Sequence, residues 1–205
     1  MVWRGAPATL TLGEIADLIA PILWFSPDEP LLARGLGPLP YSHPCDSDRR
    51  RGVVYYQVTR IQLRGEAAVR EPVDDDPELF AKARAAIIRF YFYYPEDIGV
   101  AGHVNDLEVV EFQLQLDDEG GCRQVRIERV IGFAHGVDWY YNRLVVTPDT
   151  KLPIAILVEE GKHASCPDRN ADGFYLRFGV PERSASGAAG GEAVAGGRAV
   201  VCGGR

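Results

Sequence analysis

The fold is decided by three consecutive stretches: IIRFYFYY at residues 87–94, LEVVEFQLQL at residues 107–116 and VRIERVIGF at residues 125–133. All three are rich in β-branched and aromatic residues, and the second alternates between apolar and polar side chains, as in a half-buried strand. The sequence DDEGG at residues 117–121 has the composition of a turn. We therefore expect the second and third stretches to pair as an antiparallel hairpin.

The remaining patterns are short and are separated by turn-forming residues. Further strands are predicted at residues 22–25, 53–63, 152–158 and 174–180. A helix is predicted at residues 12–20, where Thr11 and Glu14 have the spacing of a capping box, and a second at residues 74–86, which begins with acidic residues. Many short strands with few helices indicate a mainly β protein, specifically a β-sandwich decorated with short helices.

The length of 205 residues is typical of one domain. We expect residues 1–183 to form a single β-sandwich domain. Residues 184–205 consist mostly of Gly, Ala and Ser, with little apolar surface to bury, and are predicted to be a flexible tail.

Composition excludes several classes of protein. The formal net charge is −7, which argues against a nucleic-acid partner. No run of 18 apolar residues occurs, so no transmembrane segment is predicted. The first residues lack the pattern of a signal peptide, and the four cysteines form no C-x-x-C pair. A cytoplasmic protein with free thiols is expected, although the sequence leaves secretion open.

Polar residues with the chemistry of a metal site are densest in PEDIGVAGHVNDLE, residues 95–108. Asp106 and Glu108 are two residues apart at the start of a predicted strand, so their side chains share one face. His103 and Asp97 lie on the adjoining loop, which Gly residues make able to fold back. Carboxylate oxygens with one imidazole suit a divalent cation, namely Mg²⁺, Mn²⁺ or Ca²⁺. The alternative is a polar loop with both acids on a solvated face.

Two more histidines follow predicted strands, His135 and His163. Each could line a ligand pocket or simply hydrogen-bond a neighbour. Asp168, Asn170 and Asp172 fit the first half of a calcium loop, D-x-N-x-D-G, but Gly179 stands where the bidentate Glu is expected. This segment is therefore either a second cation loop or an Asx turn.

Common catalytic and nucleotide-binding motifs are absent. The chain contains no G-x-G-x-x-G, G-x-x-x-x-G-K-[ST], G-x-S-x-G or H-E-x-x-H pattern. Dinucleotide-binding, P-loop, serine-hydrolase and zinc-protease motifs are not predicted.

The segment FYFYYPEDIGVAGHVNDLEVVEFQL resembles the hallmark region of the necrosis- and ethylene-inducing-like proteins. The chain also resembles the vacuolar-protein-sorting-62-like family, through KHASCP at residues 162–167 and APILWFSPDEP at residues 20–30. The three patches occur in matching order. Asn105 and Leu107 depart from the toxin heptad, in which His and Trp stand at those positions.

The resemblance implies a β-sandwich and a metal shell formed by Asp97, His103, Asp106 and Glu108. It places His163 near the same cavity and His135 where the toxins have an A-H-G segment. For the toxin branch it also implies binding to plant sphingolipid headgroups and membrane damage.

Three functions remain open at this point. The protein could bind a polar small molecule, a glycan or a lipid headgroup at its metal pocket. It could instead be a metal-dependent hydrolase, with His163 as the candidate acid or base. In the third alternative the cation is purely structural.

Overall fold

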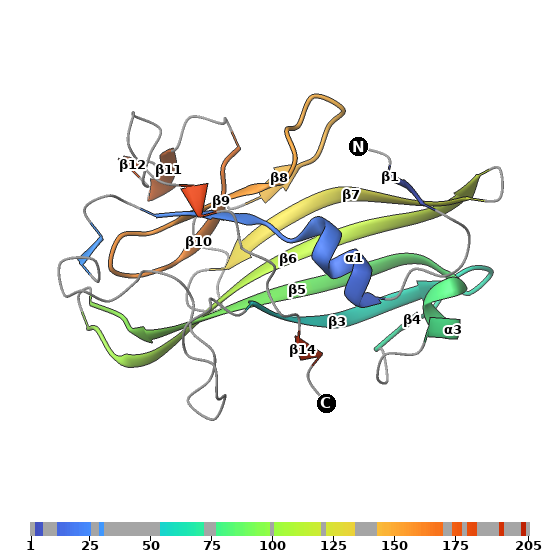
Figure 1. Ribbon diagram of the computed structural model, residues 1–205, viewed down its shortest axis with the longest axis horizontal. Coiled ribbons are helices and arrows are strands. Elements are labelled where there is room, and N and C mark those ends of the chain that lie inside the picture. Colours follow the sequence, from blue (N-terminus) through green and yellow to red (C-terminus); the bar gives the residue numbers. More distant parts are fainter. Residues whose placement is uncertain are drawn as a thin grey trace.

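The computed structural model describes residues 3–5, 12–25, 29–30, 54–71, 77–98, 101–119, 122–133, 143–169, 174–177, 180–183, 193–194 and 202–203. Within these residues the protein is mainly β, as predicted. Its strands form a large sheet and a smaller one that pack face to face (Figure 1).

The large sheet has eight strands. Its order is β1-β7-β6-β5-β3-β14, with β4 paired to β3 and β8 paired to β7. The bounds are β1 Trp3–Gly5, β3 Val54–Leu63, β4 Val69–Arg70, β5 Ala83–Glu96, β6 Val104–Glu119, β7 Cys122–Phe133, β8 Arg143–Val145 and β14 Cys202–Gly203. Strands β3, β5, β6 and β7 are antiparallel neighbours, and the predicted hairpin of the opening stretches is present.

The smaller sheet has four strands in the order β10-β9-β2-β13. The bounds are β2 Ile22–Trp24, β9 Ala155–Val158, β10 Ser165–Pro167 and β13 Ala193–Val194. A separate hairpin joins β11 Phe174–Arg177 to β12 Val180–Arg183. Two helices are described, α1 Leu12–Ile19 and α3 Pro77–Ala81.

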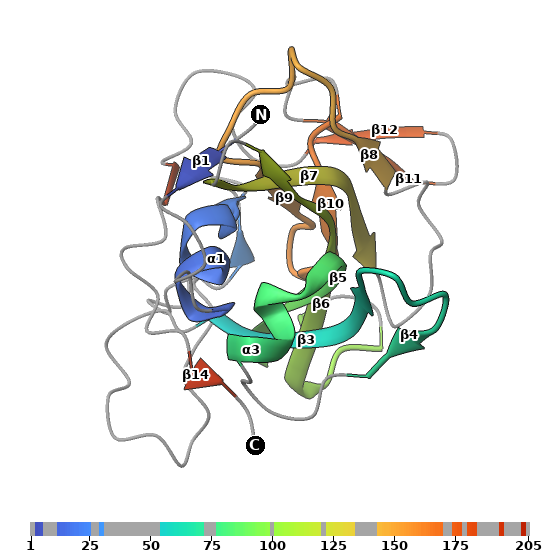
Figure 2. The same ribbon diagram turned by 90° about the vertical axis from the view of Figure 1, so that its right-hand side faces the viewer.

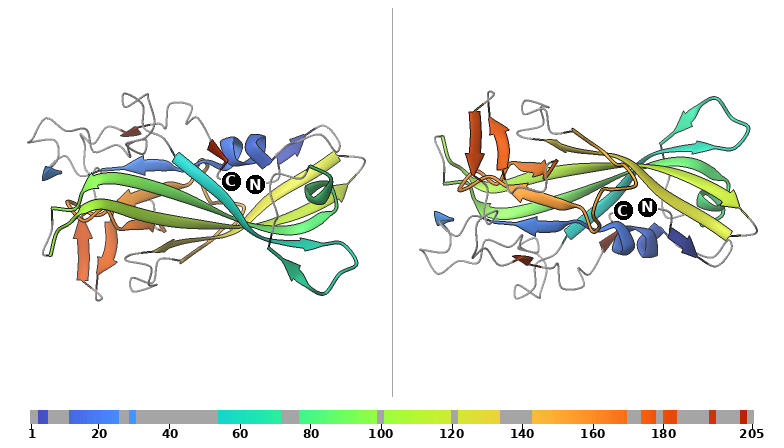
Figure 3. Two further views of the ribbon diagram at one scale, coloured as in Figure 1. Left: turned by 90° about the horizontal axis from the view of Figure 1, so that it is seen from below. Right: turned by 90° about the horizontal axis from the view of Figure 1, so that it is seen from above.

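The core lies between the large sheet and a second layer built from α1 and the smaller sheet. Seen along the strands, the large sheet curves, and α1 and β9 lie on its concave side (Figure 2). Helix α1 and β2 run along the same side of the large sheet (Figure 3). Ile15 and Ile19 from α1 pack in one cluster with Ile156 of β9 and the buried residues of β5 and β6.

Strict alternation in β5 and β6 builds the buried face of the large sheet. Every second residue of β5 from Ala86 to Tyr94 is buried, and the same holds in β6 from Asp106 to Leu116. Burying an aromatic side chain stabilises the fold by about 1.5–3 kcal/mol. Phe90 and Phe112 contact edge to face, with 5.1 Å between ring centroids. The alternation therefore sets both the fold and which polar residues enter the interior.

Several predicted elements differ in the structure. The helix predicted at residues 74–86 ends at Ala81, because Ala83 and Ala86 pair with β3 and extend β5. Strand pairing here overrides the helix preference of an alanine-rich segment. Residues 117–119, predicted as turn, continue β6. The strand predicted at residues 152–158 begins at Ala155. Of the strand predicted at residues 174–180, residues 174–177 form β11 and residue 180 begins β12. Residues 165–167 form β10, where no strand was predicted.

The predicted tail at residues 184–205 is described only at β13 and β14. Both are two-residue strands at the edge of their sheets, paired with β2 and β3. The flexibility of the tail stays a prediction. Cys166 is a free, buried thiol, as expected. Neither of the described helices is long and apolar enough to cross a membrane.

Gly132 lies where β7 of the large sheet packs directly against β10 of the smaller sheet. A Cβ atom built there would lie 1.9 Å from the backbone oxygen of Ser165 in β10. Because backbone cannot yield as a flexible side chain can, we predict that Gly132→Ala destabilises the protein by about 1–3 kcal/mol, measured by denaturant unfolding.

Gly65→Ala is the matched control. A Cβ there meets nothing within 4 Å, but the backbone has φ +75°. We expect a cost of about 1 kcal/mol from backbone strain alone. Equal costs at the two positions would show that β7 and β10 do not pack as closely as described.

Candidate functional site

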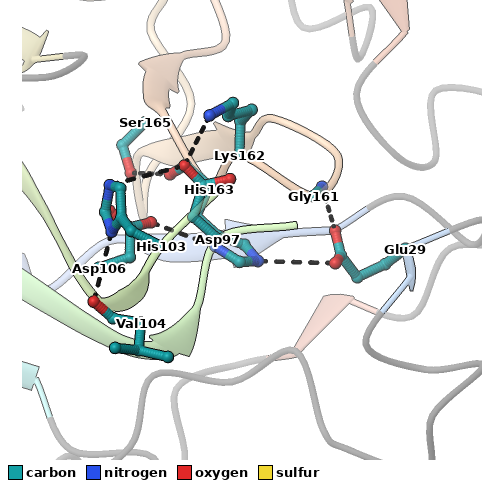
Figure 4. A network of polar contacts seen from close by, with 9 residues as sticks. All are labelled: Glu29, Asp97, His103, Val104, Asp106, Gly161, Lys162, His163 and Ser165. Atoms are coloured by element: carbon teal, nitrogen blue, oxygen red, sulfur yellow. Dashed lines mark hydrogen bonds and ion pairs between the residues drawn. The ribbon is translucent and has the colours of Figure 1, made fainter. Parts of the chain in front are cut away.

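Five buried carboxylates gather where β5 ends and β6 begins. These residues, called the acidic cluster below, are Glu29, Asp97, Asp106, Glu108 and Glu159. Electrostatic coupling joins Glu108 to Asp106, Asp97 and Glu159, and Glu29 and Asp106 both contact His163. Figure 4 shows that side chains from β6, the β5–β6 loop, the β9–β10 turn and the region of Glu29 meet here. Burial of several like charges requires compensation by protons or cations.

Asp106 and Glu108 enter the interior because of the strand register. Asp106 pairs with Tyr94, and Glu108 pairs with Phe92, both fully buried residues of β5. The two acids therefore lie on one face, as their spacing predicts. Leu107, which lies between the two acids, and Asn105, which precedes Asp106, are both exposed.

The β5–β6 loop places Asp97 inside and His103 outside. The Asp97 amide donates to the carbonyl of His103 at 2.7 Å, which closes the loop. Lys162 Nζ donates to Asp97 Oδ2 at 2.8 Å, and His103 Nε2 lies 3.8 Å from the same oxygen. The His103 side chain is 50% exposed, so it lies at the solvent edge of the acidic cluster.

The turn between β9 and β10 carries Lys162 and His163. The His163 amide donates to the Glu159 carbonyl, and the Ile98 amide donates to the Gly161 carbonyl at 2.7 Å. The Gly161 amide donates to Glu29 Oε2 at 2.9 Å. Gly161 has φ +69°, and its surroundings include Pro30 and Ile98. These contacts tie the turn to both the β5–β6 loop and the segment of Glu29.

His163 bridges two carboxylates. Its Nδ1 lies 3.3 Å from Asp106 Oδ2, and its Nε2 lies 3.5 Å from Glu29 Oε1 without hydrogen-bond geometry. The ring stacks on Tyr94, with 4.2 Å between centroids. Burial alone would lower the pKa of His163, but its contacts with Asp106 and Glu29 raise that pKa to about 9. The imidazole is therefore a cation inside the acidic cluster at neutral pH.

Glu108 differs from Asp97 and Asp106, whose carboxylates contact Lys162 and His163. Burial, followed by the charges of Asp106, Glu159 and Asp97, raises the pKa of Glu108 to about 9, although Lys162 acts against that rise. Among the described residues, no hydrogen bond to its carboxylate is present. A buried carboxylate facing other carboxylates must hold a proton or gain a cation.

The hydroxyl of Tyr94 is a second unusual group. Tyr94 is fully buried, and its Oη has no hydrogen-bond partner among the described residues. Burial raises the pKa of Tyr94 well above its ordinary value, and Glu108, Asp106 and Glu29 add to the rise. Tyr94 also pairs with Asp106 and stacks on His163, so its ring lies among the residues of the site. Leaving a buried hydroxyl unpaired costs about 1–3 kcal/mol.

The structure brings together part of the predicted site. Asp97, Asp106, Glu108 and His163 lie in one network, with His103 at its edge. Asp168 follows β10, and its amide donates to the carbonyl of Ala155. His135, Asn170 and Asp172 lie outside the described residues, so the second cation loop and the role of His135 stay predictions.

Sequence reasoning missed Glu29, Tyr94, Glu159 and Lys162 as members of the site. No sequence spacing could indicate Glu29 or Lys162, because each contacts a partner that is far away in the sequence. Tyr94 stands in an aromatic run, where a core role was the natural interpretation. Glu159 could have been found, because it directly follows a buried strand.

No ready-made metal shell is present in the described residues: no group of three His, Cys, Asp or Glu side chains has an arrangement that could hold an ion. Comparisons with family models, curated proteins and solved structures found no significant match to the chain. The resemblance noted from the sequence therefore stays a prediction.

Because burial favours the protonated form of Glu108, we predict that stability depends on pH when a chelator removes divalent cations. The pKa is 4.5 for an ordinary Glu and about 9 here, so the folded protein binds a proton that the unfolded chain releases between these values. Stability should therefore fall as pH rises through this window. His163 acts in the same direction: its contribution is complete below its ordinary pKa of 6.5 and is lost as pH rises towards about 9.

Glu108→Gln keeps the shape of the protonated acid. We expect its unfolding free energy in chelator to be close to that of the wild type at about pH 4, below the ordinary Glu pKa, and to exceed it near about pH 8. Glu111→Gln is the control, because Glu111 is also buried but pairs with Arg89 on the opposite face. A Glu108→Gln protein destabilised equally at both pH values would contradict the assignment.

Proposed function

We propose that the protein binds a divalent cation, Mg²⁺, Mn²⁺ or Ca²⁺, at the acidic cluster and uses it to present a polar ligand. Asp97, Asp106 and Glu108 are the proposed carboxylate ligands, with His103 at the solvent edge. The ligand is a polar group such as a lipid headgroup or a carbohydrate. His163 is proposed to line the pocket rather than to hold the ion.

One observation carries the proposal. Glu108 is buried against other carboxylates, and none of the residues that the structure describes donates a hydrogen bond to its carboxylate. Within the same residues, the buried hydroxyl of Tyr94 has no hydrogen-bond partner. Hard carboxylate oxygens are the preferred ligands of these three cations. A cation near Glu108 would replace the proton and relieve the repulsion, and an ordered water bound to it could satisfy Tyr94.

The surroundings of the cluster support ligand presentation over a closed structural site. Residues 101–105 are all exposed, and the last of them, Asn105, directly precedes Asp106. A cation bound between Asp97 and the half-exposed His103 would keep a side that faces solvent. An oxygen of a headgroup or a sugar could occupy that side.

Cation binding should appear as a gain in melting temperature. A ligand that binds only the folded state stabilises it, so Mg²⁺, Mn²⁺ or Ca²⁺ should raise the Tm above the value in chelator. Asp106→Asn and Glu108→Gln should weaken cation affinity in calorimetric titration by roughly tenfold or more. Glu111→Gln should bind the cation as the wild type does. Titrations of the wild type showing no binding of any of the three would overturn the proposal.

Water relaxation with Mn²⁺ tests whether the site is open. A bound Mn²⁺ that keeps an exchanging water should enhance the relaxation of bulk water protons in the presence of the protein. Added inositol phosphate or a monosaccharide should reduce that enhancement if it takes the water's place. Bound Mn²⁺ without enhancement would indicate a closed, structural cation.

A further inference from the structure

Lys162 forms an ion pair with Asp97, one of the proposed carboxylate ligands of the cation. Its ammonium lies 2.8 Å from Asp97 Oδ2, and its side chain is 13% exposed. It also lies close enough to Glu108 to lower the pKa of that group. The Lys162 ammonium is therefore a cation already placed among the proposed ligands.

An ammonium and a divalent cation cannot share this oxygen at low cost. Both need the same lone pairs of Asp97, and they repel each other strongly in a partly buried environment. A Lys ammonium is a point charge on a flexible stem, so it can leave without a change of backbone.

The backbone around Lys162 is anchored independently of its side chain. The turn is held by the bonds from Ile98 to Gly161 and from Gly161 to Glu29, at 2.7 and 2.9 Å. Departure of the ammonium from Asp97 breaks neither bond. The partial exposure of the side chain gives it a route to solvent.

We propose that Lys162 is a built-in competitor for the divalent cation. In the cation-free protein it neutralises Asp97, and a binding cation displaces it into solvent. Lys162 therefore lowers cation affinity while it stabilises the empty site, which makes the site respond to changes in cation concentration. This inference rests on the proposed function.

The test is the cation affinity of Lys162→Gln, titrated with Mn²⁺ and Ca²⁺ against the intact chain. If Lys162 only supported the fold or the cation site, its removal would weaken cation binding. A competitor should instead tighten it, by about tenfold or more for a neighbouring unit charge. Lys162→Arg keeps the charge and should retain the affinity of the wild type.

Stability supplies a second readout. Lys162→Gln should have a lower Tm than the wild type in chelator, because Asp97 loses its counter-charge. Added cation should restore that Tm and produce a larger gain than in the wild type. In the double variant Asp97→Asn with Lys162→Gln, the chelator Tm should recover and the gain in affinity should disappear.

Lys82→Gln is the control for net charge alone. Lys82 is exposed and directly precedes β5, whereas Asp97 directly follows it, roughly 45 Å away along an extended strand. This variant should leave cation affinity unchanged.

The outcomes separate the two proposals. If neither the wild type nor Lys162→Gln binds a cation, the proposed function fails and this inference fails with it. If the wild type binds but Lys162→Gln binds equally or more weakly, the competitor role alone is wrong. The same follows if added cation leaves the Tm of Lys162→Gln lowered by as much as in chelator.

Discussion

The register between β5 and β6 is the constraint on which the rest of the structure depends. It pairs Phe90 with Val110, Phe92 with Glu108 and Tyr94 with Asp106. The same two-residue period that buries the aromatic side chains of β5 thus carries two acids into the interior. A slip of one residue would expose the acids, but it would also expose Phe112 and Leu114. Hydrophobic packing therefore holds the carboxylates in an unfavourable environment.

The buried acids are accommodated by three different means. His163 accepts a proton and bridges Asp106 and Glu29, whereas Lys162 pairs with Asp97. Glu108 instead retains its own proton. Each means responds differently to conditions, since a proton depends on pH and a lysine side chain moves with little cost. The acidic cluster is therefore an adjustable part of an otherwise apolar core.

The period of two in the sequence predicted the strands of the large sheet and the shared face of Asp106 and Glu108. It could not predict Glu29 or Lys162, whose hydrogen bonds span 132 and 65 residues of sequence. Such contacts depend on how the smaller sheet lies on the large one. The predicted helix at residues 74–86 is too long for a related reason. The pairing of Ala83 and Ala86 with β3 outweighs the local preference of this segment for helix.

Among the described residues, backbone strain occurs at the end of the molecule that carries the acidic cluster. The described non-glycine residues with positive φ are Ala101, Asn105 and His163. They lie in the β5–β6 loop, at the start of β6 and in the β9–β10 turn, which are segments next to members of the acidic cluster. A left-handed conformation costs roughly 1–2 kcal/mol for such a residue. Such strain lowers the cost of local opening of the β5–β6 loop and the β9–β10 turn relative to the middle of β5 and β6. The long central strands act as a rigid frame, and the end of that frame that carries the buried charges also carries the strained backbone.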